Sequence, residues 1–320
     1  MSAIKNATIL ARAAYPPVSA WEFKSITTEK LVRDRLSAST IYFVVQRPML
    51  WFDNVEPDHN PMSFDIVDGS GKCIHCVLNV YEALGLREDE IIDVEVSFHR
   101  LETSSQRPFR HVAAIRVYRG GEFLAWWSPA KLLFEASTRG LPLKGAGDLD
   151  AFIDYDVHYI GQAFDQKVWK RLKAHAKLQD VLTEEDVRGE FHRRPALEVS
   201  LITLEIIGIQ EQGFDAQSPI LLPSPYEPII HQFDVDPPSD NFAAFYRPWL
   251  VAGDPPATNE LEAMLIHMFD PKYNEVKFSN YPNIKNGTRS VGYTYADVAI
   301  TDFPFRLKDA EGNEPLTDAD

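Results

Sequence analysis

The chain contains 320 residues, of which 45% are hydrophobic and 25% are charged, and its formal net charge is −15. This composition is typical of an ordinary globular protein, and the length allows two units that each bury a core. No run approaches the roughly 18 apolar residues that span a bilayer, and the N-terminus lacks the basic start and apolar centre of a secretory signal. We therefore expect a cytoplasmic protein without a membrane partner.

The N-terminal part divides into two segments by its pattern. Residues 1–37 form a mixed segment that we expect to be partly helical, with a helix over Lys30–Leu36. Residues 38–140 are rich in β-branched and aromatic residues and predict a β-rich domain, a candidate for target recognition. Its expected strands are Thr40–Gln46, Met49–Phe52, Ser63–Val67, Lys72–Val80, Ile92–Phe98, His111–Tyr118 and Glu122–Ser128. The turn sequence at residues 68–71, DGSG, predicts a hairpin between the third and fourth of them.

The two cysteines, Cys73 and Cys76, form a CxxC motif inside one of these expected strands. Such a motif is half of a zinc site or a redox pair when other parts of the chain complete it. The chain has no second CxxC, and the residues around this one alternate like a strand. We therefore interpret the pair as structural.

The C-terminal part begins after a linker. Residues 137–150 contain glycines and a proline between patterned segments, which predicts the linker there. Residues 148–306 predict a second domain. Its expected elements are a strand over Phe152–Gly161, a helix over Lys167–Gln179, a strand over Leu197–Ile209, a Pro-rich insert at about 210–257 and a helix over Asn259–Phe269. Residues 307–320 are acidic and predict a solvated, disordered tail.

Two motifs lie in order within this second domain. The first, VHYIGQAFDQKVWKRLKAH, runs from Val157 to His175 and places an arginine and a histidine four residues apart on a helix after a YIG strand. The second, EAMLIHMFDPKYN, runs from Glu262 to Asn274. Together they resemble the second and the last motif of GIY-YIG nucleases. The expected strand Leu197–Ile209 sits where the third strand of that family would lie, so the resemblance covers about residues 148–282.

The resemblance implies an α+β fold in which a small antiparallel sheet is flanked by helices, with the β-rich domain in front of it. It implies hydrolysis of DNA phosphodiester bonds with Mg²⁺ or Mn²⁺ as cofactor. The implied catalytic residues are Tyr159, Arg171, His175 and Glu262, and Gly161 and Asn274 are implied as structural residues near the site.

The residue types suit this chemistry. A carboxylate such as Glu262 is a hard oxygen ligand for Mg²⁺, and Arg171 offers a fork of donors to phosphate oxygens. His175 lies one helical turn beyond Arg171, on the same face, where a neutral imidazole accepts a proton from water or orients a tyrosine that does. The hydroxyl of Tyr159 would position that water, and Gly161 allows a close approach of the backbone to the helix start or to phosphate.

The first motif of the family, Gly-Ile-Tyr, should lie on an upstream strand that pairs with the YIG strand, and no Gly-Ile-Tyr or close variant appears there. Tyr155 is a poor substitute because strand alternation places it on the same face as Tyr159, about 13 Å away. Tyr118 is a candidate only if the strand His111–Tyr118 is donated from before the linker. That tyrosine is commonly assigned as the water-activating group in this family, so its absence leaves turnover open.

The charge distribution bears on DNA binding. A net charge of −15 repels phosphate at long range. Basic residues nevertheless gather around the expected Arg171 helix and before the third strand, and we expect a local DNA-binding surface there. Its members are Lys167, Lys170, Lys173, Arg193 and Arg194.

We interpret the sequence as an α+β, metal-dependent DNA endonuclease of a restriction, repair or mobile-element type. One rival is a catalytically degenerate module of the same fold that binds nucleic acid or a protein partner without cleavage. The second rival is an interaction component of a larger complex, which the acidic charge suits. A homodimer or a protein partner stays open in each case.

Overall fold

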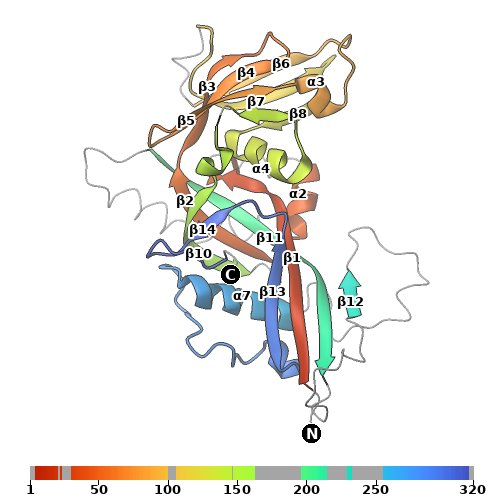
Figure 1. Ribbon diagram of the computed structural model, residues 1–320, viewed down its shortest axis with the longest axis vertical. Coiled ribbons are helices and arrows are strands. Elements are labelled where there is room, and N and C mark those ends of the chain that lie inside the picture. Colours follow the sequence, from red (N-terminus) through yellow and green to blue (C-terminus); the bar gives the residue numbers. More distant parts are fainter. Residues whose placement is uncertain are drawn as a thin grey trace, which may run out of the picture.

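The protein is described here by a computed structural model, which covers residues 4–20, 22–23, 30–99, 106–145, 147–162, 196–214, 229–232 and 255–316. Within these residues the strands form two sheets, and the fold is mixed and strand-rich, as the α+β prediction requires. Figure 1 shows the sheet of β3 to β8 at the top, the sheet with β1, β11 and β2 below it, and α4 between them. No helix of the described residues is long and apolar enough to cross a membrane.

The first sheet is assembled from strands that are far apart in the sequence. Their order is β13 (Tyr295–Thr301), β1 (Ile4–Ser19), β11 (Leu197–Phe214), β2 (Ile41–Pro48), β10 (Asp154–Gln162) and β14 (Arg306–Lys308), with β12 (Ile229–Gln232) paired to β11. The pairings β1–β11, β11–β2 and β2–β10 are antiparallel, whereas β13 and β14 run parallel to β1 and β10.

One face of this sheet packs against α7 (Pro255–Phe269). Leu261, Leu265 and Phe269 of this helix are buried in one core with Phe43 and Ile160 of the sheet, and the Phe43 and Phe269 rings meet edge to face at 6.2 Å. The helix predicted over Asn259–Phe269 is thus confirmed. It begins four residues earlier, because proline is tolerated in the first turn of a helix.

The N-terminal segment contains a long strand, β1, over residues 4–19, where we expected mixed and partly helical structure. β1 buries Ala7, Ile9 and Ala11 on one face, an alternation that the small alanine side chains conceal in the sequence. The helix predicted over Lys30–Leu36 is confirmed, since α2 spans Lys30–Ser37. The partners of β1 are residues 200–214 and 295–301, so distant pairing decides its structure.

The second sheet is built from one continuous stretch of the chain. Its order is β6 (Asp93–Phe98), β7 (Val112–Arg119), β3 (Leu50–Glu56), β4 (Met62–Asp68), β5 (Cys73–Leu78) and β9 (Leu143–Gly145), with β8 (Glu122–Trp127) paired to β7. Its predicted strands are confirmed within a few residues. The predicted hairpin turn also forms, because the Asp68 carboxylate accepts the backbone N–H groups of Ser70 and Lys72, and Gly71 adopts φ +93°.

The predicted linker at 137–150 is part of this second unit. α4 (Pro129–Arg139) ends at Gly140, which has φ +64°, and β9 then pairs with β5. A 3-10 turn at Leu149–Phe152 leads into β10. The glycines and the proline therefore mark the end of a helix and a short edge strand, and α3 (Val80–Leu84) is the remaining helix of this unit.

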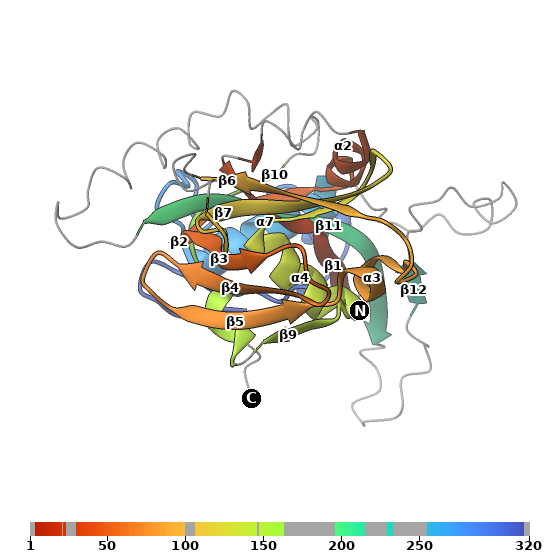
Figure 2. The ribbon, with the colours of Figure 1, turned by 90° about the horizontal axis from the view of Figure 1, so that it is seen from above.

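The second sheet is an insertion between two neighbouring strands of the first. β2 was expected in the β-rich domain 38–140, but it lies between β11 and β10. Gln46 of β2 pairs with Asp156 of β10, so the chain leaves one strand and re-enters the next at adjacent points. In Figure 2 the strands β3 to β7 curve around α4, in front of the first sheet.

The acidic C-terminal segment is partly ordered, contrary to the prediction. Leu307 is buried and lies in β14, which pairs with Asp154–Asp156 of β10. Asp309 then accepts the backbone N–H groups of Glu311 and Asn313 and closes a turn. The strong acidity of the segment conceals its two apolar contacts with the core, Leu307 and Leu316.

Cys73 is exposed and Cys76 is buried, on opposite sides of β5. No group of three or more His, Cys, Asp or Glu side chains that would hold a metal ion occurs within the described residues. The predicted helix over Lys167–Gln179 and most of the insert at 210–257 lie outside those residues.

Candidate active site

Two tyrosines face each other on the neighbouring strands β2 and β10. Tyr42 pairs with Gly161, and Val44 pairs with Tyr159, so the rings of Tyr42 and Tyr159 lie diagonally on one face of the sheet. Their centroids are 6.0 Å apart with an interplanar angle of 37°. This face, the tyrosine face, is opposite to the one that α7 covers. Its cluster consists of Tyr42, Val44, Val199, Leu201 and Tyr273, with Phe23 and Tyr159 packed against it.

Gly161 makes this arrangement possible. A Cβ atom at this position would lie 2.7 Å from the hydroxyl oxygen of Tyr42 and 2.7 Å from Cε1 of Tyr159. Both contacts are too short for real atoms, so a side chain would force the rings apart. The close approach at Gly161 thus serves the two rings, whereas the sequence suggested the helix start or phosphate.

A tyrosine therefore does oppose the YIG strand, in the sequence Thr40-Ile41-Tyr42. Tyr118, the candidate from the sequence, lies instead in β7 of the second sheet, against Phe123. The sequence gives no sign of Tyr42 at this place, because its strand is continuous with the pattern of the β-rich domain. The sheet inserted between β2 and β10 separates the two tyrosines in the sequence and conceals their pairing.

Tyr155 and Tyr159 lie on opposite faces of the sheet, not on the same face. A β-bulge interrupts the pairing of β10 between Val157 and Tyr159, and one extra residue inverts the alternation beyond it. Tyr155 is buried in the core with α7, and its ring lies 4.7 Å from the Arg47 guanidinium carbon. The bulge is what carries Tyr159 to the face of Tyr42.

The bulge also places His158 beside the tyrosine face, a residue that the sequence analysis did not single out. Its Nε2 lies 3.2 Å from Oε1 of Gln46, and its ring meets the Tyr273 ring edge to face at 6.1 Å. Burial raises the pKa of the neighbouring Asp156, and the charge of His158 acts in the opposite direction. No sequence signal distinguishes such a histidine from one in a regular strand.

Asn274 anchors the YIG strand at the edge that points away from β2. Its Nδ2 donates to the Ile160 carbonyl at 2.7 Å, and its Oδ1 accepts the Ile160 N–H at 3.0 Å. The N–H of Tyr273 donates to the His158 carbonyl at 3.1 Å. β14 pairs with Asp154–Asp156 of β10. Beyond those residues, the segment after α7 makes the hydrogen bonds to β10.

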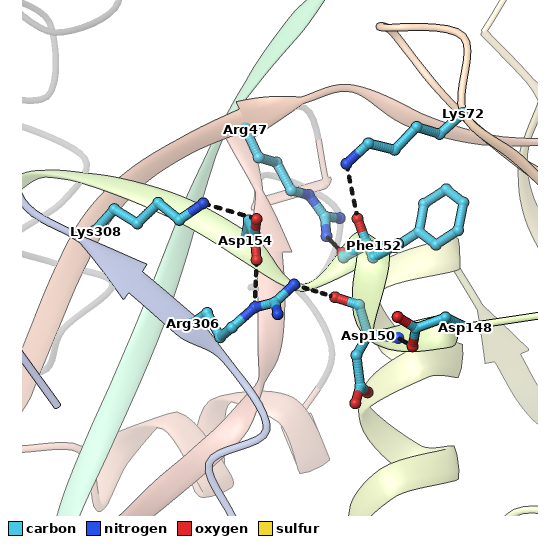
Figure 3. A network of polar contacts seen from close by, with 9 residues as sticks. Arg47, Lys72, Asp148, Asp150, Phe152, Asp154, Arg306 and Lys308 are labelled. Atoms are coloured by element: carbon cyan, nitrogen blue, oxygen red, sulfur yellow. Dashed lines mark hydrogen bonds and ion pairs between the residues drawn. The ribbon is translucent and has the colours of Figure 1, made fainter. Parts of the chain in front are cut away.

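The start of β10 is held by charged groups, as Figure 3 shows. Asp154 accepts from Arg306 Nε at 2.6 Å and from Lys308 Nζ at 2.8 Å. Burial raises the pKa of Asp154, but these hydrogen bonds outweigh it and bring the pKa below its usual value. Arg47 donates to the Phe152 carbonyl at 3.2 Å. These contacts fix the point where the chain returns from the inserted sheet.

Glu262 lies on α7 and is half-buried. Helical spacing places it on the same side as Ile266 and Phe269, which face the sheet. α7 covers the face opposite to Tyr42 and Tyr159, so Glu262 and the two tyrosines belong to different sides of the sheet.

Several predicted site residues cannot be placed. Arg171, His175, Lys167, Lys170, Lys173, Arg193 and Arg194 lie outside the described residues. Their convergence with Tyr159 and Glu262, and the local positive surface, stay predictions. A cavity of about 820 Å³ lies in the second sheet, beside Tyr81, Asp93 and Tyr118, and no element of the tyrosine pair borders it.

Comparison of the chain with family models, with curated proteins and with solved structures gave no match.

Proposed function

We propose that this protein is a metal-dependent endonuclease that hydrolyses DNA phosphodiester bonds in the manner of GIY-YIG nucleases. The observation that carries the proposal is the Tyr42–Tyr159 pair. It supports the assignment of Thr40-Ile41-Tyr42 as a variant of the first family motif, because this strand lies antiparallel to the YIG strand and presents its tyrosine across Gly161.

The described residues have separate tasks in this proposal. Tyr159 is the less buried tyrosine and would position the attacking water, with Tyr42 behind it as the second hydroxyl. Gly161 sets the separation of the rings. Asn274 fixes the backbone of Ile160 between them and thereby holds Tyr159 in place.

The donor set suits Mg²⁺ or Mn²⁺. Mg²⁺ usually binds through one or two carboxylates together with water and phosphate oxygens, and Glu262 is a half-buried carboxylate on α7. A bound ion would neutralise charge that builds up on the phosphate. Arg171 would contact phosphate oxygens, and His175 would accept a proton from water, as the resemblance implies.

One observation favours a second candidate. The Tyr42 side chain has 0% exposure, so an attacking water reaches its hydroxyl only if the surrounding side chains move. A module that keeps the fold, binds nucleic acid or a protein and does not cleave needs no such movement. The net charge of −15 also suits a protein partner.

A plasmid assay separates the two candidates. We expect the wild-type protein to nick or linearise supercoiled DNA with Mg²⁺ or Mn²⁺ and not with EDTA. Glu262→Gln should abolish cutting because it removes a metal ligand at nearly constant volume. The matched control is Glu88→Gln, an exposed carboxylate of the second unit that should cut like wild type. Wild-type rates in Glu262→Gln would end the metal assignment, and DNA binding without cutting would favour the binding module.

A further inference from the structure

Three arginines from three separate elements border a cavity of about 200 Å³ at the edge of the first sheet. Arg12 belongs to β1, Arg35 to α2 and Arg139 to the last turn of α4. Tyr15 also borders the cavity, together with the carboxylates of Glu205 and Asp302. We name this cavity the arginine pocket.

The fold creates the arginine pocket where β1 outruns its neighbour. The pairing of β1 with β13 ends at Arg12 and Thr301, so among the described residues no strand pairs with residues 13–15 on that side. α2 and α4 close the gap and bring Arg35 and Arg139 to it. The cavity is therefore a product of sheet geometry and not of a local sequence motif.

Carboxylates fix two of the guanidinium groups without using all their donors. Arg12 Nε donates to Glu205 Oε1 at 2.5 Å, and Arg139 Nη1 lies 3.1 Å from Glu135 Oε1. A guanidinium carries five N–H donors in a planar fork, so each keeps donors outside these bonds. Arg35 is exposed. Such a set suits a tetrahedral oxyanion, which takes several donors at once.

The arginine pocket shares a face with the tyrosine pair. Tyr42 lies opposite Thr203 of β11, and Arg12 lies opposite Glu205 two residues further along the same strand. Residues two apart in a regular strand point to the same side. From the strand spacing and the rise per residue, the Cα atoms of Arg12 and Tyr42 are about 12 Å apart. This distance corresponds to roughly four nucleotide steps of a duplex strand or fewer.

We propose that the arginine pocket binds a backbone phosphate of the DNA substrate, close to the phosphate that the tyrosine face would receive. This proposal rests on the proposed function and adds a substrate contact outside the motifs of the family resemblance. With the partners of Arg139 counted, four cations stand against three carboxylates on a chain of net charge −15: Arg12, Arg35, Arg139 and Lys131 against Glu205, Asp302 and Glu135. The pocket thus supplies local attraction for phosphate where the protein as a whole repels it.

The test uses Arg35→Gln and Arg139→Gln in the full chain. The matched control is Arg33→Gln, because Arg33 also lies on α2 but does not border the cavity. The probe is a labelled duplex that carries a site cut in the plasmid assay, or a random duplex if nothing is cut. Binding is measured with EDTA over a salt series. We expect each pocket variant to bind about tenfold more weakly, with a salt slope lower by about one. For Arg33→Gln the affinity, the salt slope and the single-turnover rate should all stay near those of wild type.

The outcomes separate this proposal from the nuclease proposal. If wild type cuts and both pocket variants bind normally, the arginine pocket is refuted and the nuclease stands. If wild type binds without cutting and the variants bind more weakly, the pocket stands and the nuclease fails. A wild-type protein that does not bind DNA refutes both.

A second measurement locates the contact on DNA. One methylphosphonate, which removes the charge of a single phosphate, is placed in turn at each position around the cut. We expect one position within about four nucleotides to weaken wild-type binding and to leave the already weakened Arg35→Gln unchanged. Equal losses in both proteins at every position would overturn the proposal.

Discussion

The two sheets of this protein are built on opposite plans. The second sheet uses the continuous stretch from β3 to β9, and its strands are mostly joined to near neighbours. The first sheet joins residues 4–19 to residues 197–214 and 295–301, and both tyrosines lie in it. Because the second sheet is inserted between β2 and β10, it separates these tyrosines in the sequence without separating them in space. Destabilising substitutions in the first sheet should therefore lower both the free energy of unfolding and the cleavage rate. Those in the second sheet should lower the free energy of unfolding alone.

The sharpest contrast compares one glycine from each sheet. Gly161→Ala should cost about 3 kcal/mol and abolish cutting, because the new Cβ has no room between the rings. Gly145→Ala in β9 should cost less than about 1 kcal/mol and leave cutting intact. Its nearest atoms are the side-chain ends of Ile74 and Leu149, at 3.1 and 3.2 Å, which can shift. Urea unfolding and plasmid cleavage measure both effects, and equal costs would remove the contrast.

The junction of the sheets should make stability depend on pH. Burial, followed by the charge of Glu198, raises the pKa of Glu22 to about 7 from 4.5. The folded state then binds the proton more tightly than the unfolded state. The contribution of protonated Glu22 to the free energy of unfolding is complete below about pH 4.5. It falls by about 3 kcal/mol as the pH rises to about 7.

Glu22→Gln tests this directly, because glutamine keeps the shape and cannot ionise. The free energy of unfolding of the variant should lose this fall between the two pKa values. Two ion pairs lie near Glu22: Arg47 with Glu198 at 2.7 Å, and Lys131 with Glu135 of α4 at 2.9 Å. An unchanged pH profile in the variant would show that Glu22 is not the source.

Two asparagines provide a smaller contrast. Asn274→Ala should cost about 2 kcal/mol, because it leaves the N–H and C=O groups of Ile160 without their partner. Cutting should also fall, since Tyr159 directly precedes Ile160 in the strand. Asn79→Ala removes only the N-cap of α3, whose side chain accepts the Glu82 N–H at 3.2 Å. It should cost about 1 kcal/mol and spare cutting. A normal cleavage rate in Asn274→Ala would refute the anchoring role.

The sequence predicted the continuous sheet far better than the discontinuous one, for physical reasons. The turn at Asp68 and the alternation of buried and less buried residues in β4 are local sequence signals, and the structure contains both. The strand character of β1 depends on partners almost 200 residues away, and its alanines give little pattern. The position of Tyr42 beside Tyr159 depends on a chain reversal through the whole inserted sheet, and the face of Tyr159 depends on a bulge. Neither property is encoded in a short window of sequence.

The central claim is that Tyr42 belongs to an active site, and the most direct test removes its hydroxyl alone. Tyr42→Phe keeps the ring, and Tyr155→Phe is the matched control, a tyrosine buried on the opposite face of the same sheet. Single-turnover cleavage of plasmid DNA is measured with Mg²⁺, and unfolding in urea shows whether each variant remains folded. We predict a loss of about a hundredfold or more in Tyr42→Phe and a rate within about twofold of wild type in Tyr155→Phe. A folded Tyr42→Phe protein that cuts at the wild-type rate would contradict the claim.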